Sequence, residues 1–335
     1  MNVFTEWHHG GLFHSQQLLW EKRLGNKLFG PVGFEWAEAG IWRLSTVPST
    51  IKQYLDPADC ELREDGFYYH YDPGEEIWQR RVTLDQFRAM NWEIILCTLQ
   101  EHEESFLKLR DENCPAAMYI RLVGNTGEQV NWSRIKNFID TTGLYLPPPG
   151  INAVQMAQEF DLTNFTYEAP ENPKTIINLM NCLPEADAFA IWNYLKRKLP
   201  DYKFLMFGGK GEDGNLSGLK AISEALKGSG WLFQVKHHGE GFGHVIHNAF
   251  ACGRPSLTVF EYYRGKMAGR YMRDQETCLM FDNKDPEEVV KEIRYFSEPE
   301  RHRKMCEACR AEFEKYIDFD RDEANFRQFL ARLQY

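Results

Sequence analysis

The residues most suited to binding chemistry lie between positions 236 and 255. A β-prone run ends near Val235, glycines follow at 239, 241 and 243, and a helix is expected from about His244. Glycines let an anionic group approach the backbone closely. The first amides of a helix are unpaired, and the helix dipole places positive potential at that end. The pattern predicts a loop that binds a diphosphate.

Two side chains of this segment suit a sugar nucleotide. Glu240 lies inside the glycine turn, where its carboxylate would accept hydrogen bonds from sugar hydroxyls. Asn248 follows eight residues later, inside the expected helix. Residues 253–255, Gly-Arg-Pro, are typical of a helix end followed by a strand, and Arg254 is interpreted as a residue that only caps the helix.

Residues 240–255 resemble the donor-binding segment of retaining glycosyltransferases with the GT-B fold. That family has Glu-Gly-Phe-Gly, four further residues, and Glu-Ala-x-Ala-Cys-Gly-x-Pro; this chain has the same pattern with Asn248 at the second glutamate. The resemblance implies that Glu240 contacts the donor sugar and that position 248 receives the nucleotide ribose. It also implies that the turn residues Gly241, Phe242 and Gly243 line the donor diphosphate. Asn248 accepts hydrogen bonds only as a neutral amide.

Three further segments are similar to parts of this family. Gly10 and Gly11 resemble the glycine turn after the first strand, which faces the donor phosphates; the alternative is an ordinary turn. Residues 101–103, Glu-His-Glu, resemble the loop whose histidine reaches the sugar, which implies a catalytic role for His102; the alternative is a solvated helix start. The charged C-terminal helix, ending in residues 325–333, resembles the segment that crosses back to the first domain.

The family's early basic pair in the second domain is missing from residues 175–181. Lys210, in a Gly-Gly-Lys-Gly turn, and Lys236, directly before the glycine turn, are the available cations. We favour Lys236 because of that position. The alternative is that Lys236 is an exposed lysine at the end of a strand.

The order of apolar runs predicts an α/β protein. Strands are expected at 2–7, 27–32, 92–98 and 117–123, with helices at 12–24 and 103–113, while 45–90 is interpreted as an insertion of loops and short elements. The same alternation restarts at 175–180, with helices expected at 186–198, 216–226 and 245–252, and strands at 202–207, 231–235 and 256–260. Proline-rich segments at 147–150 and 168–173 are interpreted as linkers. The sequence therefore predicts two Rossmann-like domains facing across a cleft, in the GT-B arrangement. The expected parts are 1–170 for the acceptor, 171–320 for the nucleotide sugar, and a C-terminal helix, 321–335, that returns to the first domain.

Composition narrows the class of protein. The 335 residues are 43% hydrophobic and 26% charged, which is typical of a globular protein. No apolar run or signal-like N-terminus indicates membrane insertion or secretion, so we expect a cytoplasmic protein whose eight cysteines are reduced. The net charge is −10, of which residues 1–165 carry −9 (14 Lys and Arg against 23 Asp and Glu). This acidity disfavours a nucleic acid partner.

Other ligand classes fit the sequence less well. His237, His238, His244 and His247 offer a possible metal site, but the GT-B resemblance implies that helix amides and cations replace a metal, so we expect none. Residues 208–211 lack the Walker spacing, and no Rossmann Gly-x-Gly-x-x-Gly follows the first strand. We also expect no cofactor apart from the donor substrate.

The resulting prediction is a hexosyl-type glycosyltransferase that moves a sugar from a nucleotide-diphosphate sugar to an unknown hydroxyl acceptor. Retention of the anomeric configuration and independence from metals are implied by the resemblance. Three alternatives stay open: a GT-B nucleotide-sugar epimerase, a non-catalytic sugar-nucleotide-binding module, and a phage-type enzyme acting on a hydroxymethylated DNA base.

Overall fold

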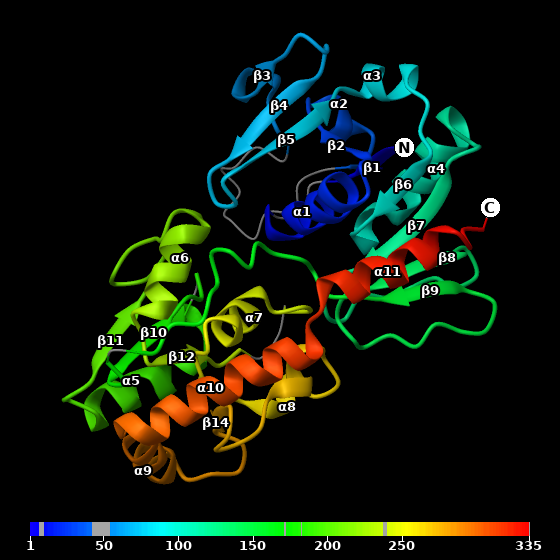
Figure 1. The fold of residues 1–335 in the computed structure, drawn as a ribbon. Helices are drawn as coiled ribbons and strands as arrows, with labels where there is room; N and C mark the ends of the chain where they lie inside the picture. Colours follow the sequence, from blue (N-terminus) through cyan, green and yellow to red (C-terminus); the bar gives the residue numbers. More distant parts are fainter. Residues whose placement is uncertain (7–9, 42–53, 171, 182, 237–239, 335) are drawn as a thin grey trace. The chain divides into compact units, whose positions relative to one another are not determined.

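A computed structural model describes residues 1–6, 10–41, 54–170, 172–181, 183–236 and 240–334. The chain divides into two compact units. Unit 1 contains Met1–Phe160 and Phe319–Tyr335, and unit 2 contains Asp161–Asp318. Each unit has its own sheet covered by helices (Figure 1).

Unit 1 is built on a nine-stranded sheet with the order β3-β4-β5-β2-β1-β6-β7-β8-β9. The strands from β5 to β9 in this order are parallel, and the β3–β4 and β4–β5 pairs are antiparallel. Its elements are β1 (Asn2–Thr5), α1 (Gly10–Gln17), η1 (Leu18–Arg23), β2 (Lys27–Pro31), α2 (Glu35–Glu38), η2 (Pro57–Asp59), β3 (Glu61–Leu62), β4 (Tyr68–Asp72), β5 (Ile77–Val82), α3 (Leu84–Ala89), β6 (Ile94–Cys97), η3 (Gln100–His102), α4 (Glu103–Asn113), β7 (Met118–Val123), β8 (Asn137–Asp140), β9 (Asn152–Gln155) and α11 (Phe319–Leu330).

The central strands of unit 1 are apolar on both faces, as expected for a sheet covered by helices on each side. Successive residues belong to different core clusters because side chains alternate along a strand. Val3 packs in one cluster with residues of α1 and α11, whereas Phe4 packs in the other with residues of α2, α3 and α4. Phe4 stacks on Trp36 with ring centroids 4.8 Å apart.

The described part of residues 45–90 extends this sheet. Strands β4 and β5 pair antiparallel from Tyr68↔Arg81 to Asp72↔Ile77, and β5 pairs in parallel with β2. The segment does consist of short elements, as expected, but its strands belong to the main sheet, which was not predicted. Residues 42–53 lie outside the described residues.

Unit 2 has a five-stranded parallel sheet with the order β11-β10-β12-β13-β14. Its elements are β10 (Thr175–Asn178), η4 (Leu183–Glu185), α5 (Ala188–Lys198), β11 (Lys203–Met206), α6 (Gly218–Lys227), β12 (Trp231–Gln234), α7 (His244–Ala251), β13 (Ser256–Thr258), α8 (Phe260–Tyr263), η5 (Ala268–Tyr271), β14 (Cys278–Met280), α9 (Pro286–Phe296) and α10 (Pro299–Tyr316). The two sheets confirm the predicted α/β class.

Most elements outside 45–90 lie where the sequence predicts them, and the differences have local causes. The first helix begins at Gly10 rather than at residue 12, and its second half, Leu18–Arg23, is a π-helix. Gly25 ends it with a φ of 67°. Strands β8 and β9 were not predicted, and residues 147–150, which we expected to be a linker, connect these two strands within unit 1.

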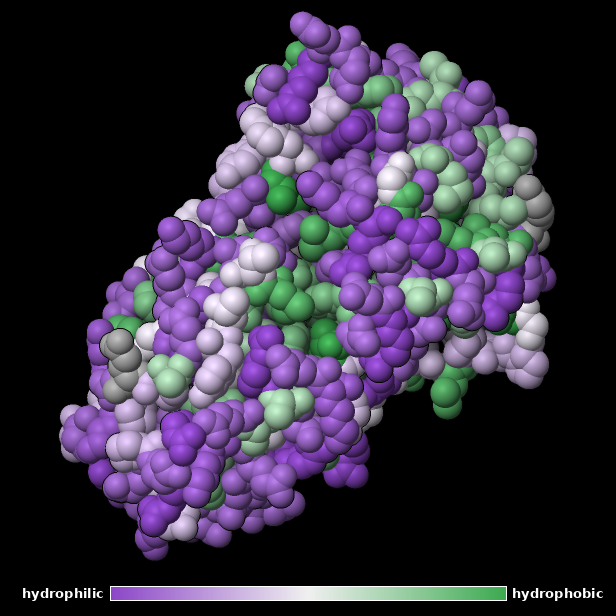
Figure 2. Space-filling model, viewed as in Figure 1, coloured by the Kyte–Doolittle hydropathy of each residue, from purple (hydrophilic) through white to green (hydrophobic). Residues whose placement is uncertain are grey.

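Hydrophilic residues cover most of the surface that Figure 2 shows. Large exposed apolar side chains are scattered, and the most exposed of them is Leu146, at 93%. Among the described residues, no helix is both long enough and apolar enough to cross a membrane. The described cysteines are all free thiols, and Cys306 and Cys309 are buried in α10.

Candidate functional site

The glycine-rich segment of unit 2 lies between the end of β12 and the start of α7. Gly243 is the residue before α7 and has left-handed backbone angles, with φ 84° and ψ 56°, which glycine adopts without strain. Gly243, the N-cap residue, has no side chain that could cap α7, and the start of a helix presents amide groups suited to binding an anion. His237, His238 and Gly239 lie outside the described residues.

Glu240 is held in a buried position at this helix start. Its side chain is 9% exposed, and its contacts within the described residues converge on Oε2. Gln234 Nε2 donates to Oε2 at 3.1 Å, Tyr263 OH lies 3.5 Å from it, and Lys236 Nζ pairs with it at 3.5 Å. Oε1 stays available to a ligand, and a Cβ on Gly243 would lie only 3.1 Å from it.

Helix α8 and the residues after it hold the backbone of Glu240. The Glu240 amide donates to Tyr262 OH at 2.8 Å, and Lys266 Nζ donates to the Glu240 carbonyl at 2.9 Å. The Lys266 ammonium also lies 3.3 Å from the centroid of the Tyr262 ring, within cation–π range. Burial lowers the pKa of Lys266 to about 8, because desolvation disfavours the charged ammonium. Lys266 was not predicted from the sequence, because no recognisable motif surrounds it.

Asn248 lies in the first turns of α7 and is 6% exposed. Its Oδ1 is buried and has no hydrogen-bond partner among the described residues. An unpaired buried amide oxygen costs free energy unless a ligand or water supplies a donor. Asn248 is therefore suited to receive a hydroxyl.

His247 has a structural role in the same helix. Its Nδ1 donates to the Gly243 carbonyl at 2.9 Å, and its ring stacks on Phe242 with centroids 3.7 Å apart. Burial lowers its pKa to about 3, so the ring is neutral at pH 7. The described residues contain no group of three or more His, Cys, Asp or Glu side chains that could hold a metal ion.

The two other basic residues of unit 2 that were singled out in the sequence, Arg254 and Lys210, lie away from Glu240 in the chain. Arg254 is fully buried and donates to backbone carbonyls, including those of Leu226 at 3.0 Å and Glu168 at 2.7 Å. It thus joins the ends of α6 and α7 to residue 168, as a structural clamp. Lys210 is exposed and follows β11, which is separated from β12 by β10.

In unit 1, Gly10 and Gly11 form the start of α1 rather than a turn before it. A Cβ on Gly10 would lie 2.7 Å from Asp72 Oδ2 and 3.0 Å from Glu75 Cγ. Glu75 Oε2 also pairs with His14 Nδ1 at 3.0 Å. These carboxylates already complement the helix dipole, and they would repel a second anion.

His102 is fully buried at the end of η3, so the interpretation of a solvated helix start is wrong for this side chain. Its Nδ1 lies 4.0 Å from Oε2 of Glu6, the residue directly after β1. Burial, followed by the charge of Arg121, lowers the pKa of His102 to about 4. Burial also raises the pKa of Glu6 to about 7, although hydrogen bonds from Thr98 oppose this.

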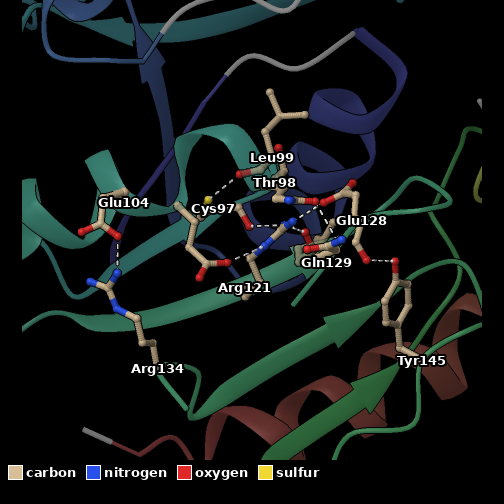
Figure 3. Close-up of polar contacts among 12 residues, drawn as sticks. Cys97, Thr98, Leu99, Glu104, Arg121, Glu128, Gln129, Arg134 and Tyr145 are labelled. Carbon is tan, nitrogen blue, oxygen red and sulfur yellow. Dashed lines mark hydrogen bonds and ion pairs between the residues drawn. The ribbon is translucent and has the colours of Figure 1, made fainter. Parts of the chain in front are cut away.

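Arg121, on β7, provides the charge that acts on both Glu6 and His102. Figure 3 shows this arginine near Cys97 and Glu128. The guanidinium is fully buried, pairs with Glu128, and lies 3.4 Å from Glu103 Oε2. Its Nη1 donates to the Cys97 carbonyl at 3.3 Å, and Tyr145 OH donates to the Glu128 carbonyl at 2.7 Å. His102 was predicted from the sequence, whereas Glu6 and Arg121 were not. Glu6 directly follows the run of β1, and Arg121 is a single charged residue inside the apolar run of β7; these positions were the only available signals.

No protein-family model matches this sequence, and no curated protein is significantly similar to it. Solved structures do match its fold. Anabaena Alr3699/HepE in complex with UDP-glucose has a TM-score of 0.64 at 9% identity, covering 99% of this chain and 100% of that one. The pneumococcal O-GlcNAc transferase GtfA, in complex with UDP and GlcNAc, has 0.61 at 9%, covering 99% and 98%. An alpha-glucosyltransferase in complex with UDP-glucose and DNA containing an abasic site has 0.59 at 10%, covering 98% of both chains.

The chain has the GT-B fold. Within this GT-B fold, the residues singled out in the sequence divide between the two units. Gly10, Gly11 and His102 belong to unit 1. The residues of unit 2 are Lys210, Lys236, Glu240, Gly241, Phe242, Gly243 and Asn248, and all of them except Lys210 lie between β12 and the end of α7.

Proposed function

We propose that this protein is a glycosyltransferase that uses a nucleotide-diphosphate sugar, with the donor bound by the β12–α7 segment of unit 2. The observation that carries the proposal is the buried Glu240, held beside Lys236 just before α7, whose N-cap residue is Gly243. The GT-B fold supports it, because the solved structures similar to this chain include transferases in complex with UDP-glucose or with UDP and GlcNAc.

Each part of the segment has a proposed task. The amides of Gly241, Phe242 and Gly243, with those at the start of α7, bind the diphosphate. Lys236, whose side chain is 34% exposed, neutralises part of its charge as the leaving group forms. Glu240 accepts hydrogen bonds from hydroxyls of the transferred sugar through Oε1.

Asn248 is the proposed acceptor for a hydroxyl of the nucleotide ribose. Its Oδ1 is buried and lacks a partner within the described part of the chain, so a ribose hydroxyl would satisfy it. His102 is the proposed sugar-contacting residue of unit 1, where its imidazole is neutral at pH 7. Gly10, Gly11 and Lys210 are weaker candidates, given the carboxylates beside Gly10 and the exposure of Lys210.

The finer properties follow the GT-B resemblance. We propose transfer of a hexose with retention, no metal in the chemical step, and no cofactor apart from the donor. We also propose a cytoplasmic location, in keeping with reduced cysteines.

The test is calorimetric titration of the protein with a panel of nucleotides and nucleotide sugars, including UDP-glucose, UDP-GlcNAc and GDP-mannose. We expect one nucleotide sugar to bind, and Glu240→Gln to weaken binding of the sugar nucleotide more than that of the nucleoside diphosphate alone. Glu261→Gln is the matched control, because Glu261 is exposed on α8 and pairs with Arg264. Binding of no nucleotide sugar by the folded protein would contradict the proposal.

The acceptor has one specific alternative. A solved structure similar to this chain is an alpha-glucosyltransferase bound to DNA, so a duplex with hydroxymethylated bases is a second candidate acceptor. The net charge of −10 opposes it. Transfer of labelled sugar to such a duplex would decide in its favour. Conversion of the donor without any acceptor would instead indicate an epimerase, and binding without turnover would indicate a non-catalytic module.

A further inference from the structure

Glu6 lies at the point where the strand order of the unit 1 sheet reverses. After β1 the chain forms β2 on one side, and it later forms β6 on the other side of β1. Ligands of open parallel sheets bind at the carboxyl ends of the strands at such a switch point. Glu6 follows the last residue of β1, and Thr98 follows the last residue of β6. Both therefore lie at this switch point.

The carboxyl group of Glu6 is fixed through one of its two oxygens. The Thr98 amide donates to Oε1, and Thr98 Oγ1 donates to the same atom at 2.5 Å. Oε2 is buried and has no hydrogen-bond partner among the described residues, although the side chain is only 1% exposed. A buried carboxyl oxygen without a hydrogen-bond donor costs free energy. A ligand that supplies a donor would remove this cost.

The neighbouring groups do not satisfy Oε2. His102 Nδ1 is 4.0 Å away, which is too far for a hydrogen bond. The nearby cation, Arg121, pairs with Glu103 and Glu128, and no hydrogen bond from it to Oε2 is found among the described residues. Burial also raises the pKa of the Cys97 thiol well above its usual value, so this group stays neutral and brings no charge to Glu6.

We propose that Glu6 is the hydroxyl-binding residue of unit 1: its Oε2 accepts a hydrogen bond from the alcohol group of the acceptor substrate. The proposal rests on the proposed glycosyltransferase function and deepens it by naming the group that recognises the acceptor. The ligand class is an alcohol, such as a sugar or polyol, because a hydroxyl donates to a carboxylate and leaves a lone pair for the new bond.

The variant Glu6→Gln tests this geometry with little change in shape. Its amide oxygen can still accept from Thr98, but the position of Oε2 becomes an NH₂ group, which donates instead of accepting. The nucleotide sugar that binds most tightly is used as donor, glycerol serves as the alcohol, and release of the nucleoside diphosphate is measured. We expect the KM for glycerol to rise about tenfold or more, as for loss of a charge-assisted hydrogen bond, with the donor Kd unchanged.

The matched control is Glu128→Gln, which also removes a buried carboxylate beside Arg121 but does not alter Oε2 of Glu6. The KM for glycerol should stay at the wild-type value in this variant. A wild-type KM in Glu6→Gln, or the same increase in both variants, would overturn the proposal.

The pH dependence gives a second readout that a purely structural role would not change. Ionised Glu6 is the better acceptor, so the KM for glycerol should fall as the pH rises through about 7, the pKa of Glu6. Among the described residues, the charged or titratable groups around it are Arg121, Cys97 and His102, and none of them changes charge in this range. A flat wild-type profile overturns the proposal even if Glu6→Gln does not fold.

Two further outcomes separate the two proposals. If a nucleotide sugar binds but glycerol never stimulates release, the assignment of Glu6 fails and the donor site stands. If no nucleotide sugar binds to the folded protein, the proposed function itself fails.

Discussion

Asn248 is the residue at which this chain departs from the GT-B motif. We expect Asn248→Ala to raise the KM for the donor by about tenfold, since one hydrogen bond to the ribose is lost. Asn248→Glu should preserve or improve donor binding, because a carboxylate is the stronger acceptor. Steady-state kinetics over a range of donor concentrations measures both. A KM for the donor that equals the wild-type value in both variants would mean that Asn248 only packs within α7.

Lys266 lies outside the glycine-rich motif and holds the backbone of Glu240 through a hydrogen bond to its carbonyl. We expect Lys266→Met to weaken donor binding by about tenfold, because the bond to the Glu240 carbonyl is lost while the apolar stem is kept. The pKa of Lys266 is lowered to about 8, so wild-type donor affinity should fall as the pH rises above that value.

Calorimetry between pH 7 and pH 9 is the measurement for Lys266. Arg264→Met is the control, since Arg264 is exposed in the same segment and pairs only with Glu261 among the described residues. Equal donor affinities in the Lys266 variant and the wild type would show that Tyr262 alone is sufficient to hold the loop.

At the scale of elements, Arg254 joins two helix ends. Its guanidinium donates to the carbonyls of Leu226, Lys227 and Cys252, at 3.0, 2.7 and 2.9 Å. We expect Arg254→Met to lower the free energy of unfolding by ~3 kcal/mol, because several buried carbonyls lose their donors together. Urea denaturation measures this, with the exposed Arg264→Met again as the reference. A loss below ~1 kcal/mol would mean that water replaces the guanidinium.

Local patterns were sufficient to predict most elements. Helix α4 has the predicted limits, Glu103–Asn113, because acidic residues begin it and an apolar stripe continues through it. Strand β8, Asn137–Asp140, was missed because its two end residues are polar yet fully or almost fully buried. Polar residues at the ends of a short run hide its alternation, and only pairing with β7 and β9 reveals the strand.

The candidate site was predictable only where a motif is contiguous. The glycines and Glu240 are contiguous with the start of α7, so their grouping follows from the sequence. Glu6, Thr98 and Arg121 come from three different strands or strand ends, and their approach depends on the order of the sheet. Burial of Glu6 and the resulting pKa also depend on packing that no local pattern encodes.

At the scale of the molecule, three buried histidines predict sensitivity to acid. Burial lowers the pKa of His102 and His302 to about 4 and that of His247 to about 3. The unfolded chain therefore binds protons first, at its pKa near 6.5, so this stability is present above pH 6.5 and is lost as the pH falls toward 4. Each histidine contributes on the order of 3 kcal/mol to this loss.

Thermal denaturation between pH 7 and pH 4 tests the prediction. His302→Gln should flatten the part of the curve that belongs to unit 2, because a glutamine amide does not titrate in this range. A melting temperature that does not change over this range would show that the histidines are accessible to protons in the folded state.

The proposed transferase activity should not require a divalent metal. We expect transfer to persist after dialysis against EDTA, since the α7 amides and Lys236 supply positive potential at the proposed donor site. Activity is measured with and without added magnesium, manganese or zinc. Complete loss that one metal reverses would contradict this prediction and would favour ligands that include His237 or His238.

The return of the chain to unit 1 has a consequence for the order of its synthesis. Phe326 and Phe329 of α11 complete the core cluster that contains Val3 and Trp20, and Asp322 Oδ2 accepts from the Ala157 amide at 2.8 Å. A ribosome adds roughly 5–20 residues per second, so these side chains emerge many seconds after the strands they cover. Until α11 emerges, the apolar side chains of unit 1 that it covers stay exposed. A chaperone would bind the nascent chain during this interval.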